Sequence, residues 1–476
     1  MEKHNTYDTD YTLIFSSVMN SSGSVKFIDH YGDGEECIGI NVEDKEFSYR
    51  IQKEFPSIIA DLIDLATAIH ATDRLTSQDL QQEQTRIHVT LPVRHPELLS
   101  TISFQNKLSK LLTRATGSRW LFNFSRRLDS GRTIEQQSLL SPADAYVDEV
   151  TLWSGGLDAL AGLYTRLQTN EDVRFMLFGA GSNNNVYARQ AEVFNAVKPS
   201  FPNRLNLCRV PVRFSNSKAH RKNKISRARG VVFTLLGSAC AYLMGQQTLY
   251  LYENGIGAIN LPYRKSAVGL DHTRAVHPQI LLLVSDLVSE LLKEEFRVQN
   301  PFLFWTKAEM CQALTEDGRI DLPPLTKSCD SPHRKNPSQC GYCSSCILRK
   351  QSLAASQMED KTLYVVPHGK KPVEDTTLYL KHMLAQVYTL RDLLNVSNPH
   401  NLQWKSITRR FSELNYIVDQ TAIAENLLPT DMQKKLLRLY QKYISEWEAV
   451  ESKVWDGFLN QSSDRQTSHD QLVAVQ

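Results

Sequence analysis

From residue 149 onward, short apolar runs alternate regularly with longer helical patterns, and this alternation constrains the fold more than any other feature. Each apolar run precedes a helical pattern: "EVTLW" and "LDALAGLYTRLQ", "VRFMLFG" and "NVYARQAEVFNAV", "LNLCRVPV" and "GVVFTLLGSACAYLMG", and then "QTLYLYENG". Such alternation is typical of a parallel sheet covered by helices. We therefore predict an α/β fold whose ligands bind at the carboxyl ends of the strands.

The chain before this alternation has a mixed pattern. Residues 55–75 have the apolar spacing of a helix, whereas residues 85–93 and 119–127 have the character of strands. These patterns predict a small α+β domain over residues 1–147, with a linker at 136–148.

The chain after residue 355 is predicted to be helical. Helical patterns cover residues 378–396 and 429–459, and the last residues, 461–476, have the composition of a disordered tail. The predicted organisation is therefore an N-terminal α+β domain, an α/β domain over 148–355 and a helical region over 356–460.

Charge and hydropathy exclude several broad classes of protein. The 476 residues include 54 Lys and Arg against 52 Asp and Glu, a net charge of +2, which does not indicate nucleic acid, a membrane or an acidic polymer as partner. The N-terminal residues lack the build of a signal peptide, and apolar stretches such as 231–245 are short and interrupted by Thr and Ser. We expect a soluble, cytoplasmic protein.

A Ser-Gly-Gly sequence stands where the first apolar run ends and a helical pattern begins. Gly155 and Gly156 permit positive φ and leave backbone N–H groups accessible, and the helix N-terminus adds partial positive charge. With the Ser154 hydroxyl, the segment is predicted to bind phosphate. Asp158 lies just inside the helix, where it could cap the helix or help to hold Mg²⁺. The sequence fits neither a Walker A loop nor G-x-G-x-x-G, and a simple tight turn is the alternative.

Four of the eight cysteines are clustered, and the last three have C-x-x-C-x-x-C spacing: Cys329, Cys340, Cys343 and Cys346. This spacing lets a tight turn direct two sulfurs at one ion. Four thiolates form a closed tetrahedral zinc site, which has a structural role because no coordination position is open. An iron–sulfur cluster is the main alternative, although the Cys-Pro of ferredoxin runs is missing. His333 is an alternative ligand.

The glycine segment resembles S-G-G-x-D-S, the pyrophosphate loop of ATP pyrophosphatases, which adenylate a substrate by cleaving ATP between the α and β phosphates. The corresponding residues are Ser154, Gly155, Gly156, Leu157, Asp158 and Ala159. The resemblance implies that they bind ATP with Mg²⁺, in a fold similar to the adenine nucleotide alpha hydrolases. Ala159 departs from the final serine. One neutral hydrogen bond contributes about 0.5 to 1.5 kcal/mol, so the departure implies about tenfold slower catalysis without excluding activity.

Residues 306–349 resemble the C-terminal segment of the QueC family, the 7-cyano-7-deazaguanine synthases of queuosine biosynthesis, with a similar Lys-Ala-Glu and C-G-x-C-x-x-C followed by Arg. "SRARGVVFTLLGSACAY" also resembles their helix that opens with Arg, and the resemblance spans about residues 150–352. It implies that Arg227 and Arg229 contact ATP, with Arg229 facing the phosphates. It also implies that Lys307 stabilises charge on the α-phosphate or the leaving pyrophosphate. The alternatives are a solvated helix start and an exposed lysine.

The resemblance fades between residues 252 and 278, where the synthases have a Tyr-Pro-Asp-Cys segment for the deazaguanine. Here Glu253 and Asn254 follow a predicted strand, and the next loop contains Arg264, Lys265, Asp271, His272, Arg274 and His277. A carboxylate can hydrogen-bond a guanine-like edge, and basic side chains can hold a carboxylate or phosphate. An ordinary polar loop is the alternative. The residues that we expect to bind substrate are Glu253, Asn254, Arg264, His272 and Arg274.

The N-terminal and C-terminal additions resemble those of extended QueC-like proteins of bacterial antiphage systems, the QatC type. This resemblance implies an ATP-dependent ligase, with ATP, Mg²⁺ and Zn²⁺ as cofactors, that adenylates a 7-deazaguanine carboxylate and joins it to an amine such as the N-terminus of a partner protein. Direct nucleic-acid binding is not indicated. The alternatives are a synthase that uses ammonia, a tRNA-modifying adenylase of the thiolase kind, and a nucleotide-binding subunit without activity.

Overall fold

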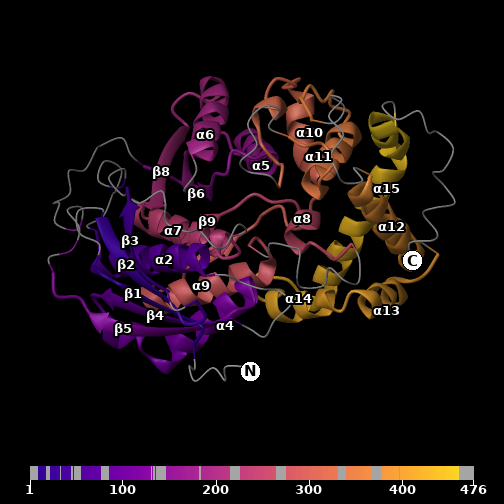
Figure 1. Cartoon of the computed structure of the whole chain (residues 1–476). Helices are drawn as coiled ribbons and strands as arrows, with labels where there is room; N and C mark the ends of the chain where they lie inside the picture. The colour runs from indigo at the N-terminus through magenta and orange to yellow at the C-terminus, as the bar shows by residue number, and fades with distance from the viewer. Residues whose placement is uncertain are drawn as a thin grey trace.

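The computed structural model describes residues 9–17, 22–32, 34–43, 47, 55–76, 85–129, 131, 135, 146–181, 184–214, 226–263, 275–330, 339–365, 377–395 and 397–459. Within these ranges, ten strands form one mostly parallel sheet in the order β10-β9-β6-β7-β8-β3-β2-β1-β4-β5. Figure 1 shows helices packed around this sheet and a group of C-terminal helices beside it. No helix in the described ranges is long and apolar enough to cross a membrane.

The predicted α/β alternation is confirmed. Five parallel strands form one side of the sheet: β6 (Glu149–Leu152), β7 (Phe175–Gly181), β8 (Leu205–Phe214), β9 (Thr248–Tyr250) and β10 (Arg297–Gln299). The helices after these strands are α5 (Leu157–Thr169), α6 (Asn184–Val197), α7 (Arg229–Leu243), α8 (Gly255–Ile259), α9 (Pro278–Leu292) and α10 (Lys307–Glu316). Because the strands are parallel, the loops at their carboxyl ends meet at one edge of the sheet.

The two faces of the parallel strands belong to different apolar cores. Phe175 and Leu177 pack with α5 and α6, whereas Met176 and Phe178 pack with the core that contains α7 and α9. This is the period-two alternation of a strand that is buried on both faces. The edge where the strands end is therefore supported by helices from both sides.

The N-terminal part extends the same sheet. Its elements are β1 (Tyr11–Phe15), β2 (Ser22–Asp29), β3 (Gly34–Val42), α2 (Ser57–Leu75), β4 (Arg86–Val93), α3 (Pro96–Leu99), α4 (Ile102–Thr116) and β5 (Arg119–Arg126). The helix predicted at 55–75 and the strands predicted at 85–93 and 119–127 are confirmed. The sequence did not predict that β3 pairs antiparallel with β8, with Val42 opposite Val212. The domain boundary near residue 147 stays a prediction, since the sheet and its core continue across it.

Asp73 joins α2 to the start of α7. Its carboxylate is buried and accepts hydrogen bonds from the Ser226 hydroxyl and from the backbone N–H of Ala228 (3.2 Å). We expect Asp73→Ala to lower the free energy of unfolding by about 1 to 2 kcal/mol, because the buried Ala228 N–H and the half-buried Ser226 hydroxyl both lose their acceptor. Asp73→Asn keeps one acceptor oxygen and should retain most of that stability. Denaturant unfolding tests this prediction, which equal stability of Asp73→Ala and wild type would contradict.

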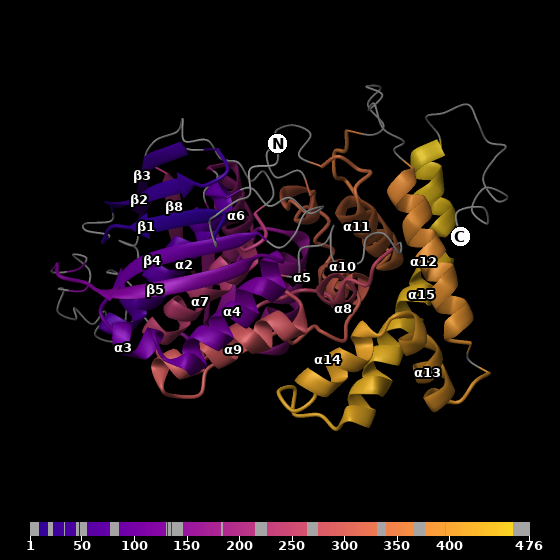
Figure 2. The same cartoon turned by 60° about the horizontal axis from the view of Figure 1, so that its bottom comes forward.

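The C-terminal region is helical, as predicted. It contains α12 (Leu378–Leu393), α13 (His400–Arg410), α14 (Glu413–Thr421) and α15 (Pro429–Leu459). The preceding helix, α11 (Ser344–Ala355), begins directly after Cys343 and contains Cys346. Figure 2 shows α12 and α15 side by side, and α15 also packs against α11 and α8. Most of the predicted linker and the whole predicted tail lie outside the described residues.

Candidate functional site

The predicted glycine loop lies at the carboxyl edge of the sheet, between β6 and α5. Gly155 has a φ of +71°, and a Cβ there would approach the Gln190 backbone to 3.2 Å, so the turn requires glycine. The Gly156 N–H faces the Ser154 hydroxyl at 3.1 Å, and Ser154 itself is exposed. The loop therefore places an exposed hydroxyl and a glycine turn at the start of a helix, where the partial positive charge of the helix favours an anion.

The side chains of Leu157 and Ala159 point into the protein core and are not part of the exposed surface of the loop. They are 0% and 5% exposed and belong to the core beneath α5. Any contact of these two residues with a nucleotide would therefore go through the backbone. Whether Ala159 slows catalysis stays a prediction.

Four predicted site residues meet beside this loop. Lys307 Nζ lies 2.7 Å from Asp158 Oδ2. Asn254 Nδ2 donates to Asp158 Oδ1 (2.8 Å) and to Glu253 Oε1 (2.9 Å). The Lys307 side chain is 5% exposed and the Asp158 side chain is 14% exposed. We call Asp158, Glu253, Asn254 and Lys307 the carboxylate–lysine cluster.

Short helices and neighbouring strands hold this cluster in place. Asn254 is the N-cap of α8 and accepts from the Gly257 N–H (2.8 Å), which leaves its side-chain amide directed at the two carboxyl groups. Asn300, which follows β10, donates to the backbone oxygen of Glu253 (2.8 Å) and accepts from its N–H (3.3 Å). The position of Glu253 is therefore set by backbone hydrogen bonds as well as by its side chain.

The charges in the cluster are strongly coupled. Burial raises the pKa of Glu253 to about 8, and the nearby charge of Asp158 adds to the increase, while Lys307 opposes it. Burial disfavours the charged form of Lys307, but Asp158 and Glu253 outweigh burial and raise its pKa. Near pH 7 the cluster therefore contains the ion pair between Lys307 and Asp158 beside a mainly neutral Glu253.

This raised pKa predicts how stability depends on pH. The folded chain keeps the Glu253 proton above the carboxyl group's ordinary pKa of 4.5, so stability falls as the pH rises from about 4.5 to about 8. Glu253→Gln removes this titration. The difference in the free energy of unfolding, variant minus wild type, should therefore rise by about 1 to 3 kcal/mol from pH 5 to pH 9. Urea unfolding at the two pH values measures this, with Glu448→Gln, at an exposed position, as the control. A pH-independent difference would contradict the prediction.

The two predicted arginines do not join the cluster through the contacts that the structure describes. Arg227 donates to the backbone oxygen of Thr116 (3.2 Å) at the end of α4. This contact favours the alternative interpretation, in which Arg227 belongs to a helix start and does not contact ATP. Arg229 is the first residue of α7, and its side chain is exposed. The N–H of the preceding residue, Ala228, donates to Asp73. A contact between Arg229 and phosphates stays a prediction.

The predicted substrate loop is only partly covered by the structure. The positions outside the described residues are Arg264, Lys265, Asp271, His272 and Arg274. His277 is described and is buried as the N-cap of α9, where its Nδ1 accepts from the Gln279 N–H (3.3 Å). That contact gives His277 a structural role.

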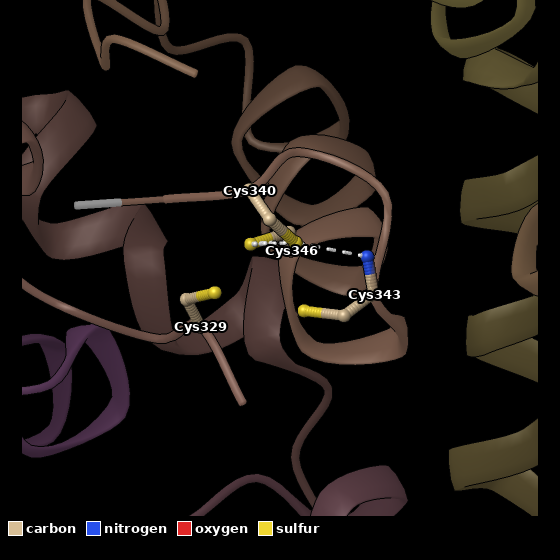
Figure 3. Close-up of side chains that lie close together, drawn as sticks. All are labelled: Cys329, Cys340, Cys343 and Cys346. Atoms are coloured by element: carbon tan, nitrogen blue, oxygen red, sulfur yellow. Dashed lines mark hydrogen bonds between the residues drawn. The ribbon is translucent and has the colours of Figure 1, made fainter. Parts of the chain in front are cut away.

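The four clustered cysteines converge as a metal site would require (Figure 3). The Sγ atoms of Cys329, Cys340, Cys343 and Cys346 all lie within 4.8 Å of one another, and those of Cys340 and Cys346 are 3.9 Å apart. A tetrahedral zinc with Zn–S bonds of about 2.3 Å places its sulfurs about 3.8 Å apart. The thiolates of a multi-iron cluster stand farther apart, because the metal ions and sulfides lie between them. The four thiols could therefore bind zinc. His333 lies outside the described residues.

Arg349, three residues after the last of these cysteines, links both ends of the segment that contains them, residues 323–362, which we call the cysteine segment. Its side chain is fully buried and donates to Thr326 Oγ1 (2.7 Å), Thr362 Oγ1 (2.8 Å) and the Pro323 carbonyl (2.5 Å). From the same stretch, the Lys327 N–H donates to the Gly155 carbonyl (3.3 Å). The cysteine segment therefore supports the glycine loop directly. Sequence reasoning missed the structural roles of Arg349 and Lys327, because their partners are backbone groups and hydroxyls without a local pattern.

Cys311 lies one helical turn after Lys307 and is fully buried. Burial raises its pKa to about 12, and the charge of Asp158 adds to the increase, so it remains a thiol near neutral pH. The thiolate is the reactive form of cysteine. This environment argues against the alternative of a thiolase-type adenylase, which needs reactive cysteines near the nucleotide.

Comparison with known proteins relates the part of the chain that contains Lys307 and the four cysteines to one family. The family model described as "Queuosine biosynthesis protein QueC" matches residues 277–357, a range that includes Lys307 and the four cysteines. A 7-cyano-7-deazaguanine synthase of Syntrophobacter fumaroxidans is 27% identical over 138 residues, which are 29% of this chain and 55% of that protein. The chain thus matches about half the length of that relative. Together the two matches support a QueC-like family.

Proposed function

We propose that the protein uses ATP to adenylate a carboxylic acid of the 7-deazaguanine class and then joins the acid to an amine, with release of pyrophosphate and AMP. The observation that carries the proposal is the carboxylate–lysine cluster next to the glycine loop. Asp158, which binds Lys307, is only two residues beyond Gly156. The charge of Lys307 and the glycine turn therefore lie at the same edge of the sheet, where a triphosphate would need both positive charge and backbone N–H groups.

In the proposed adenylation, the amides of Ser154 to Gly156 hold the pyrophosphate portion of ATP. Lys307 neutralises charge that develops on the α-phosphate or the leaving pyrophosphate, and Arg229 adds charge from the start of α7. The substrate carboxylate attacks the α-phosphorus, and the bond to the pyrophosphate breaks. Positioning and charge stabilisation are most of what such a transfer requires of a protein. Mg²⁺ bound with ATP would neutralise part of the phosphate charge, while a zinc ion at the cysteines would stabilise the fold.

Glu253 and Asn254 are proposed to recognise the deazaguanine ring. A neutral Glu253 carboxylic acid offers one donor and acceptor sites, which suit the donors and acceptors on the ring edge of a guanine-like base. Asn254 is proposed to act through Glu253, because its buried amide donates to the Glu253 carboxyl group and orients it. The substrate carboxylate is proposed to bind the basic side chains of the following loop, Arg264, His272 and Arg274.

The acceptor amine is proposed to belong to a partner protein of an antiphage system, as in the QatC type. Support comes from the described N-terminal and C-terminal elements, which lie outside the range matched by the QueC family model. A second candidate is the synthesis of 7-cyano-7-deazaguanine with ammonia. The name of the curated relative favours this candidate.

The test is to incubate the purified protein with α-labelled ATP, Mg²⁺ and 7-carboxy-7-deazaguanine, with ammonium, with a peptide that has a free N-terminus, or with neither. Acid-dependent AMP formation would support the proposal. A nitrile formed with ammonium would identify the synthase, and a peptide whose mass increases by the acyl group would identify the ligase. Absence of AMP under every condition would contradict both and favour a nucleotide-binding subunit.

A further inference from the structure

The start of α10 is held by a side chain from the distant C-terminal helix α15. Thr306 is the N-cap of α10, and its Oγ1 accepts from the Glu309 N–H (3.1 Å), while Glu309 Oε2 accepts from the Thr306 N–H (2.8 Å). The Thr306 hydroxyl in turn donates to Glu446 Oε1 (2.7 Å). Thr306 is 1% exposed and Glu446 is 6% exposed. This bond fixes the orientation of the hydroxyl, so that its lone pairs face the helix amide.

A second residue of α15 reinforces the same contact. Arg438, about two turns before Glu446, donates to the Phe304 carbonyl (3.1 Å) and to Glu309 Oε2 (3.0 Å). Next to it, Leu439 packs so closely against Gly255 that a Cβ on the glycine would lie 2.7 Å from the leucine side chain. Gly255 directly follows Asn254 of the carboxylate–lysine cluster. Helix α15 therefore supports two of the segments that contribute to the cluster.

We infer that Glu446 is a positioning residue for Lys307, and that α15 thereby forms part of the support of the active site. This inference rests on the proposed function. Lys307 is the first residue of α10 and directly follows the capped Thr306. Its backbone position is consequently set by the cap that Glu446 orients. Without that acceptor, the Thr306 hydroxyl can rotate, the first turn can fray, and Nζ loses its defined place 2.7 Å from Asp158.

Three variants test the inference. Glu446→Ala removes the acceptor, Glu446→Gln keeps an acceptor oxygen, and Glu448→Ala removes an exposed carboxylate from the same helix. We expect Glu446→Ala to lower kcat for AMP formation about ten- to a hundredfold, with KM for ATP changed less than about threefold. Glu446→Gln should retain at least about a third of kcat, since one hydrogen bond is preserved in a weaker form. Glu448→Ala should match wild type.

Hydrogen exchange of the peptide that covers residues 304–312 provides a readout that does not depend on activity. Glu446→Ala should exchange faster there, whereas Glu446→Gln and Glu448→Ala should not. Full kcat in Glu446→Ala, or a loss in Glu446→Gln as large as in Glu446→Ala, would overturn the inference. If wild type forms no AMP, the proposed function fails. Faster exchange in Glu446→Ala would then still support the positioning role, and unchanged exchange would overturn it.

Discussion

Replacement of Lys307 by methionine should lower AMP formation from ATP about a thousandfold. The loss is expected because one preorganised charge at a developing anion contributes about 10²- to 10³-fold to such a rate. Methionine keeps an unbranched apolar stem in a site where only 5% of the lysine is exposed. Asp158 then loses its ion pair but keeps the hydrogen bond from Asn254, so we expect a less stable but folded chain.

Labelled ATP and the 7-deazaguanine acid measure this effect, with circular dichroism as the test of folding. Lys434→Met is the matched control, because Lys434 also lies near the start of a helix but its side chain is 62% exposed. Asp158→Asn should show a similar loss, since it weakens the group that orients Lys307. Unchanged turnover in both Lys307→Met and Asp158→Asn would remove the cluster from the proposed chemistry.

Loss of the metal should have the largest effect on stability. We expect about one zinc per chain, and we expect Cys343→Ser to lose it and to melt at least about 10 °C lower. The reason is that binding of a structural zinc contributes directly to the free energy of folding. The cysteine segment also packs against the glycine loop through Lys327 and is held by Arg349, so its loss should reduce activity as well.

Elemental analysis and thermal unfolding, with and without a chelator, test the zinc prediction. Cys37→Ser is the matched control, because Cys37 is an exposed cysteine of β3, outside the cluster. It should keep the metal and the melting temperature. Iron with visible absorbance, or a Cys343→Ser protein with full zinc content and an unchanged melting temperature, would contradict the prediction.

Most of the site that could be predicted from the sequence was predicted from short local patterns. The Ser-Gly-Gly turn and the C-x-x-C-x-x-C run are short, and each places its groups by backbone geometry within a few residues. The meeting of Asp158 and Asn254 could also be anticipated, because both follow predicted strands of the same parallel sheet. Lys307 follows β10, a three-residue strand that was not predicted from the sequence. Parallel strands bring their carboxyl ends to one edge whatever the loops contain.

Long-range partners could not be predicted in the same way. Thr306 and Glu446 are 140 residues apart, and Asp73 and Ala228 are 155 apart, and neither pair has a pattern that links its members. Arg227 illustrates the related difficulty for single charges. An arginine before a helix can face a phosphate or a backbone carbonyl, and in this structure it faces the carbonyl of Thr116.

The pairing of β3 with β8 has a consequence for how the chain folds as it is made. Ile40 to Val42 cannot form their hydrogen bonds to β8 until Val212 to Phe214 have been synthesised, about 170 residues later. At a synthesis rate of about 5 to 20 residues per second, that interval is roughly 10 to 30 seconds. During this time one edge of β3 has unpaired backbone groups, and an open strand edge is a template for pairing with other chains. The nascent chain can therefore pair with other chains at this edge until β8 has emerged.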